Sequence, residues 1–191
     1  MKITRRYAIG GAVVVLVVIA VLVVVSVERL VPPRRAAARP APSPNVAATA
    51  HINVTLFYGS LDGEALIPLR REVPLADGIV AQGAQILNAQ LADAPSPLAS
   101  VIPKGTSLRA FYVTDRGDAF VDLSREISMA HPGGSLLEMM TVYALVDAVT
   151  ANLPRIHRVQ LLVDGRTVDT IAGHIDVRKP LVPDLSLVRS K

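Results

Sequence analysis

The chain has 191 residues, of which 51% are hydrophobic, and it contains neither cysteine nor tryptophan. Without cysteine we expect no disulfide bond, thiolate nucleophile, cysteine-based zinc site or lipid-modified N-terminal cysteine. Seven of the 20 basic residues but only one of the 16 acidic residues lie in residues 1–50, so residues 51–191 are slightly acidic. Such a near-neutral domain is not expected to bind nucleic acid, whereas the basic N-terminal part is expected to contact anionic lipid headgroups.

The first element in the chain is an uncharged apolar run over residues 7–27, in which 14 of the 21 side chains are Val, Leu or Ile. A helix of that length spans about 31 Å, which is close to the thickness of a hydrocarbon core. A cleaved signal peptide is the alternative, but its apolar core is typically about 7–15 residues long. We therefore expect an uncleaved transmembrane signal anchor, although arginines flank the run on both sides and do not by themselves fix its orientation.

A proline-rich segment follows the apolar run, with Pro32, Pro33, Pro40, Pro42 and Pro44 set among alanines and arginines. Proline removes backbone donors and fixes φ, so this linker should be extended, with a reach of about 70 Å. The expected organisation is a cytoplasmic tip (1–6), a transmembrane anchor (7–27), a linker (28–50), a folded domain (51–184) and a tail (185–191).

Hydrophobic periodicity within the domain predicts strands and two long helices in the order β-β-α-β-β-α-β-β. The strands are expected at 52–58, 65–73, 107–113, 119–123, 159–163 and 167–171, and the helices at 77–92 and from 135 to the residue before Pro154. Pro68 places the second strand at a sheet edge. This order indicates an α+β fold with one mixed or antiparallel sheet and helices packed on one of its faces.

Two local motifs in the second half of the domain carry specific expectations. Ser135 and Glu138 have the spacing of a capping box, in which the serine oxygen accepts from the N3 amide and the glutamate reaches back. Asp164-Gly165 is a tight-turn signal, which predicts that the strand 159–163 is followed by a returning strand over 167–171.

Eight short segments, taken in order, resemble the GerMN domain of bacterial sporulation and germination proteins. They are residues 54–58, 66–74, 102–106, 120–124, 134–138, 143–146, 159–165 and 173–176. The resemblance implies an α+β domain related to ring-building motifs, which lies outside the cytoplasmic membrane and acts through protein–protein contact rather than catalysis. It also implies an N-in orientation for residues 7–27. The chain departs from many relatives in having no lipidated cysteine, and residues 91–95 lack the family's Gly-Pro.

His174 and Asp176 are the best candidate polar site. Side chains two residues apart on a strand share a face, so this pair could bind a metal or transfer a proton in a hydrolase. A third metal ligand would have to come from His51 or His157. The alternative is that His174 and Asp176 fix the chain end by hydrogen bonds, and we therefore expect no metal, cofactor or catalytic residue.

The expected function is that of a non-catalytic, single-pass protein of the bacterial cytoplasmic membrane. Its domain would bind an envelope protein or a second copy of itself, in an assembly related to sporulation or germination. A module that binds cell-wall glycan or peptide is the alternative, and it requires a concave site with convergent polar groups. A hydrolase built on His174 and Asp176 is a further alternative.

Overall fold

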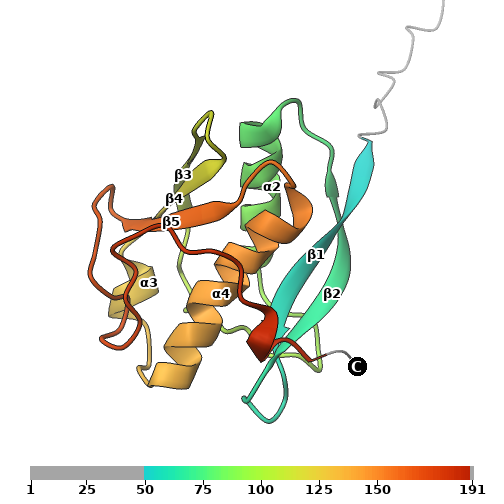
Figure 1. Cartoon of the computed structure of the whole chain (residues 1–191). Helices are drawn as coiled ribbons and strands as arrows, with labels where there is room; N and C mark the ends of the chain where they lie inside the picture. Colours follow the sequence, from blue (N-terminus) through green and yellow to red (C-terminus); the bar gives the residue numbers. More distant parts are fainter. Residues whose placement is uncertain (1–49, 190–191) are drawn as a thin grey trace, which may run out of the picture. The chain divides into compact units, whose positions relative to one another are not determined.

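The computed structural model describes residues 50–189 (Figure 1). The predicted tip, the predicted anchor and all but the last residue of the predicted linker lie outside the described residues. Within residues 50–189, no helix is both long enough and apolar enough to cross a bilayer. The elements are β1 (His51–Gly59), β2 (Leu66–Pro74), α2 (Ile79–Leu91), β3 (Leu108–Val113), β4 (Asp118–Leu123), α3 (Glu126–Met129), α4 (Ser135–Asn152), β5 (Arg158–Val163) and the 3₁₀ turn η1 (Leu185–Leu187).

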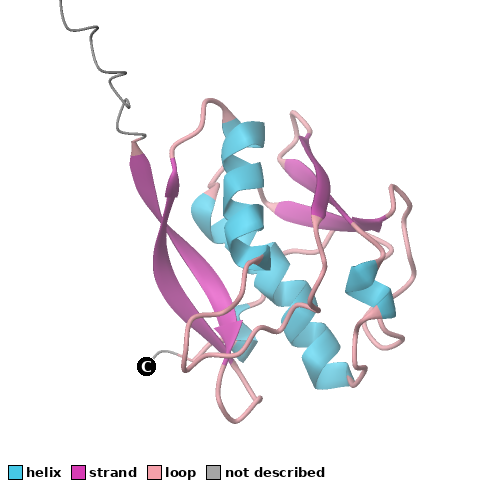
Figure 2. Ribbon diagram, turned by 180° about the vertical axis from the view of Figure 1, so that it is seen from behind, coloured by secondary structure: helices cyan, strands magenta, loops and turns pink. Residues whose placement is uncertain are grey.

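The strands form two sheets, so the prediction of one sheet is wrong although the α+β class is confirmed. β1 and β2 make an antiparallel hairpin, and β3, β4 and β5 make a mixed sheet in which β4 and β5 run parallel. Helices α2 and α4 lie between the hairpin and the three-stranded sheet (Figures 1 and 2). α2 contacts β1, β2 and β3, while α4 contacts β1 and β5, and the helices therefore do not pack on one face of a single sheet.

Helix α4 is the centre of the core. Residues 144–149 are all buried, and six consecutive residues cover more than one helical turn, so α4 is enclosed on every side at this level. Gly83 allows α2 to approach the mixed sheet closely, because a Cβ atom at this position would lie within 2.1 Å of the Phe111 ring. The enclosed turn of α4 and the close approach of α2 to Phe111 bring both helices into one hydrophobic core with the strands.

No third strand joins the hairpin beside β1, because side chains of α2 and α4 take the place of a neighbouring strand. The Gln90 amide accepts from the Phe57 N–H at 2.9 Å and donates to the Phe57 carbonyl at 2.7 Å. Asn152 makes the same pair of hydrogen bonds with Thr55, at 2.8 and 2.7 Å. Since buried backbone groups must be paired, these two amides satisfy the edge of β1 without a further strand.

The edge position predicted from Pro68 is confirmed, since β2 pairs only with β1 in the described sheets. Pro68 lies opposite Phe57 in the register, and Arg70 lies opposite Thr55. Phe57 and Thr55 direct their backbone groups away from β2, so by the alternation of an antiparallel pair Pro68 and Arg70 point outward on the other side. A proline costs no ladder hydrogen bond at such a position.

The predicted returning strand 167–171 is absent from the structure, which is a correction. The turn itself forms, with positive φ at Asp164 and Gly165 and a bridge between Val163 and Arg166. Beyond Arg166 the chain leaves the sheet, and its amides at Ile171 and Ala172 donate to a carboxylate on α4 instead of to β5. A side-chain acceptor therefore replaces the strand ladder that the sequence predicted.

We predict that Gln90→Leu destabilises the domain by about 2–4 kcal/mol, because it leaves the Phe57 N–H and carbonyl buried without partners. Urea denaturation of the full chain measures this loss. Gln85→Leu on the same helix is the matched control, because Gln85 is only partly buried and its side chain makes no hydrogen bond within the described residues. An equal effect of the two substitutions would contradict the proposed role of Gln90.

Candidate functional site

The capping box predicted for Ser135 and Glu138 is wrong. Gly134 occupies the N-cap position of α4, and no side chain caps the helix. The Glu138 side chain is fully buried and turns toward the C-terminal segment, where it contacts residues 171–174. Buried amides of an irregular segment need an acceptor that no strand supplies, and a carboxylate satisfies several of them at once.

Both carboxylate oxygens of Glu138 are occupied. Oε1 accepts from the N–H groups of Ile171 at 2.9 Å and Ala172 at 2.7 Å. Oε2 accepts from the N–H of His174 at 2.8 Å and lies 3.1 Å from its ring Nδ1. Four donors fill the acceptor sites that an ionised carboxylate offers, so this group has no position left for a substrate. It holds the C-terminal segment against α4.

The Glu138 carboxylate is ionised in the folded state. Burial would raise its pKa, but the N–H groups of Ala172, His174 and Ile175 and the His174 ring together hold the pKa below the ordinary value for glutamate. Nearby, the His131 Nδ1 accepts from the Gly133 N–H at 2.9 Å, and its Nε2 lies 3.1 Å from the Thr141 hydroxyl. Burial lowers the pKa of His131, which favours a neutral ring that donates from Nε2.

Asp176 and His174 do not form the predicted pair. Asp176 is exposed and binds the guanidinium group of Arg178, which holds the pKa of this carboxyl well below its usual range. His174 instead contacts Glu138, since the segment is not a strand and neighbouring side chains need not share a face. In the described part of the chain, no three histidine, aspartate or glutamate side chains lie close enough together to hold a metal, so neither His51 nor His157 completes a site.

A groove at one end of the domain is a second candidate site, which sequence analysis did not find. It consists of two cavities of about 120 and 330 Å³ that share Ile79 and Arg155. Together they are lined by residues from the start of β1, from where α2 begins, from where α4 ends and from the β3–β4 turn: Ile52, Leu75, Ala76, Gly78, Ile79, Val80, Gln82, Val113, Thr114, Asp115, Gly117, Leu153, Pro154 and Arg155. We call this surface the α2–α4 groove.

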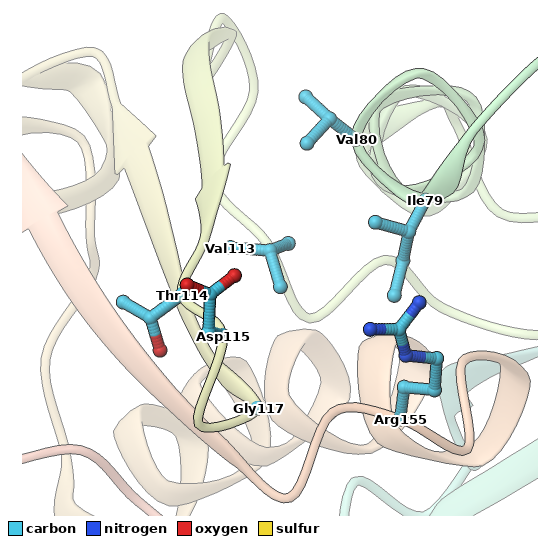
Figure 3. A pocket seen from close by; sticks show the side chains of 7 residues that line it. All are labelled: Ile79, Val80, Val113, Thr114, Asp115, Gly117 and Arg155. Atoms are coloured by element: carbon cyan, nitrogen blue, oxygen red, sulfur yellow. The ribbon is translucent and has the colours of Figure 1, made fainter.

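The α2–α4 groove combines apolar walls with a charged rim. Leu75 and Val80 remain 52% and 46% exposed at its mouth, which is unusual for large aliphatic side chains. Arg155 directs its guanidinium group into the space between α2 and the β3–β4 turn, across from Asp115 (Figure 3). Among residues 50–189, Arg155 forms no ion pair. The apolar pair Leu75-Ala76 directly after Pro74 is the sequence signal that marks this surface.

We predict that Glu138→Gln destabilises the domain by about 3–5 kcal/mol, because an amide places a donor among groups that all donate and removes the charge they solvate. Unfolding by urea at several pH values measures the difference from wild type. The folded pKa of Glu138 lies below the unfolded value of about 4.3. The carboxylate therefore contributes its full stabilisation of the folded state above pH ~4.3, and this stabilisation is lost as the pH falls through the folded pKa.

The exposed Glu72→Gln substitution on β2 is the matched control and should change the unfolding free energy by less than about 0.5 kcal/mol. A Glu138→Gln variant as stable as this control, or a difference that grows in acid, would contradict the role assigned to Glu138.

Comparison with known proteins places the chain in a family. Residues 55–169 match the family described as "Germane: Sporulation and spore germination". None of the curated proteins matches the chain. Among solved structures, a candidate lipoprotein from Clostridium perfringens is 26% identical, with a TM-score of 0.50 over 70% of this chain and 88% of that one.

Two structures of the Bacillus subtilis sporulation protein GerM share the fold. Its first GerMN domain is 18% identical, with a TM-score of 0.51 over 70% of this chain and 96% of that chain. Its tandem GerMN domains are 15% identical, with a TM-score of 0.55, and the match spans 70% of this chain and 46% of theirs. The family match covers more than half of the chain, so the protein belongs to the GerMN-type sporulation and spore germination family, as the resemblance of its residues predicted.

Proposed function

We propose that the chain is a non-catalytic, membrane-anchored protein whose GerMN domain lies outside the bacterial cytoplasmic membrane and binds another protein of an envelope assembly. The apolar run over residues 7–27 supports the anchor, and family membership supports a role in sporulation or germination. The observation that carries the binding role is the α2–α4 groove, where Leu75 and Val80 stay exposed beside an apolar cavity.

The partner that fits this groove is a protein segment with an apolar side chain next to a carboxylate. The larger cavity is lined mainly by aliphatic residues such as Ile52, Leu75 and Leu153, which suit an apolar anchor. Arg155 at the rim forms no ion pair within the described residues and would attract an acidic group of the partner. The larger cavity is mainly apolar, whereas a glycan- or cell-wall-binding site needs convergent polar groups, so this cavity favours a protein partner.

We expect the domain to be accessible from outside the cell, and the cysteine-free chain allows a direct test. Asn88→Cys places one thiol on an exposed face of α2, and Thr4→Cys places one in the predicted tip. A membrane-impermeant maleimide should label Asn88→Cys in intact cells and Thr4→Cys only after permeabilisation. Labelling of Thr4→Cys alone in intact cells would reverse the proposed orientation. Labelling of neither thiol in intact cells would mean that the maleimide does not reach the domain, which would contradict the proposed exposure.

We expect a photo-cross-linking residue at position 80 to capture one discrete envelope protein, or a second copy of the chain, in intact cells. Leu75→Glu should reduce that cross-linked species at least about tenfold, because it puts a charge into an apolar contact. Leu61→Glu is the matched control, because Leu61 is 78% exposed in the β1–β2 turn, outside the α2–α4 groove. The binding role of the groove fails if Leu75→Glu and Leu61→Glu leave the same cross-linked species at the same level.

A further inference from the structure

Strand β2 has a free edge on the side away from β1. At the start of the strand, the Leu66 carbonyl accepts from the Arg189 N–H at 2.9 Å, so the C-terminal segment covers that end. Over residues 68–74, no described strand other than β1 pairs with β2. The backbone groups at positions 68, 70, 72 and 74 point outward, by the alternation of an antiparallel pair. We call the outward side of residues 68–74 the β2 edge.

A proline at each end limits the hydrogen bonds that the β2 edge can make. Pro68 and Pro74 have no N–H, so the outward-facing amides of the edge belong to Arg70 and Glu72 alone. The carbonyls of the same two residues also point outward and can accept from a neighbouring strand. A strand paired here is therefore held mainly at two adjacent outward positions.

The two residues that offer these backbone groups carry opposite charges. Arg70 and Glu72 are exposed, and neither forms an ion pair within the part of the chain that the structure describes. Side chains two residues apart on a strand lie on the same face. An antiparallel strand that complements this edge must place a carboxylate opposite Arg70 and a basic group opposite Glu72. The β2 edge itself has this order when it is read in the reverse direction.

We propose that the β2 edge pairs with the β2 edge of a second copy of the chain, in the antiparallel register that sets Arg70 opposite Glu72 of the second copy. Each Arg70–Glu72 pair exchanges both backbone hydrogen bonds and brings opposite charges together, and the two-fold symmetry repeats this pair. The other edge of the hairpin is occupied by Gln90 and Asn152, so the assembly closes at two copies.

Other registers of this pair are less favourable. A shift by two residues sets Arg70 opposite Arg70, or Glu72 opposite Glu72, and like charges directly opposite each other destabilise a strand pair. A shift by one residue sets outward-facing groups against groups that already bond to β1. The proposed register has one repulsive contact, Arg71 opposite Arg71 on the other face, against two attractive pairs.

A contact of this size is weak in dilute solution. The paired segment is short, and its ion pairs are exposed to solvent, so each adds little. We therefore expect a monomer with free Arg70 and Glu72 amides when the chain is dilute, and pairing when the chain is concentrated. A membrane anchor would concentrate the chains, and only this concentration step rests on the proposed function.

Disulfide trapping in the cysteine-free chain tests the pairing and its register. Arg71→Cys places two thiols at the two-fold axis, where the Cα atoms of a non-hydrogen-bonded pair lie about 4.5 Å apart, within the range of a disulfide. Arg70→Cys and Glu72→Cys are the matched controls, because both positions are also exposed but each thiol lies diagonal to its copy, about 7–8 Å away.

The purified full chain is oxidised at high concentration in a non-ionic detergent, and the dimer is measured on a non-reducing gel. Arg71→Cys should form the disulfide dimer at least about tenfold faster than either control, because only its thiols are within bonding distance. Fastest trapping at position 70 or 72 would overturn the proposed register. Equal rates at all three positions, or no dimer at any of them, would overturn pairing with a second copy.

Charge reversal in the Arg71→Cys background tests the two ion pairs. Arg70→Glu should slow trapping at least about fivefold, because it sets two carboxylates opposite each other. Adding Glu72→Arg should restore the rate, since opposite charges then face each other again. Arg116→Glu makes the same charge change at an exposed position in the β3–β4 turn and should leave the rate unchanged. Equal slowing by Arg70→Glu and Arg116→Glu, or no recovery in the double variant, would refute the proposed pairs.

The β2 edge and the α2–α4 groove can be tested separately. Val80 lines the groove and lies on α2, so Val80→Glu should leave the trapping rate of Arg71→Cys unchanged. A change of that rate by Val80→Glu would contradict a contact made through the β2 edge alone. Failure of the partner contact at the groove is therefore distinguishable from failure of the strand pairing.

Discussion

The structure depends on one constraint: backbone groups that no strand satisfies must be paired by side chains of the two long helices. Gln90 and Asn152 take the place of a strand beside β1, and Glu138 accepts from the amides of residues 171–174 that no strand pairs. This arrangement allows two small sheets to stand on opposite sides of α2 and α4 without joining (Figure 2). It also explains why the Gln90 and Glu138 side chains are buried in otherwise apolar surroundings.

Local sequence signals predicted most elements because each has its cause within a few residues. Pro68 marked the edge of the hairpin, and the turn at Asp164-Gly165 formed as expected. The errors arose where a distant residue decides the outcome. Nothing within reach of Glu138 in sequence indicates that its partners are 33 to 36 residues away, so the capping motif was the wrong interpretation. The short helix α3, which buries Ile127, carries too few residues to give a periodic signal.

The candidate binding groove comes from tertiary structure rather than from a motif. The α2–α4 groove joins residues from four separate parts of the chain, namely Ile52, residues 75–82, residues 113–117 and residues 153–155. The motif that looked most like a site, His174 and Asp176, is divided between a partly exposed contact of His174 with Glu138 and an exposed ion pair of Asp176 with Arg178.

Hydrogen exchange of backbone amides in the native full chain tests the central constraint most directly. The amides of Ile171, Ala172 and His174 lie in no helix or strand, yet each donates to the buried Glu138 carboxylate. They should exchange as slowly as the amides of α4, whereas the outward-facing amides of Arg70 and Glu72 on the free edge of β2 should exchange rapidly. Exchange of residues 171–174 as fast as that of Arg70 would contradict the account.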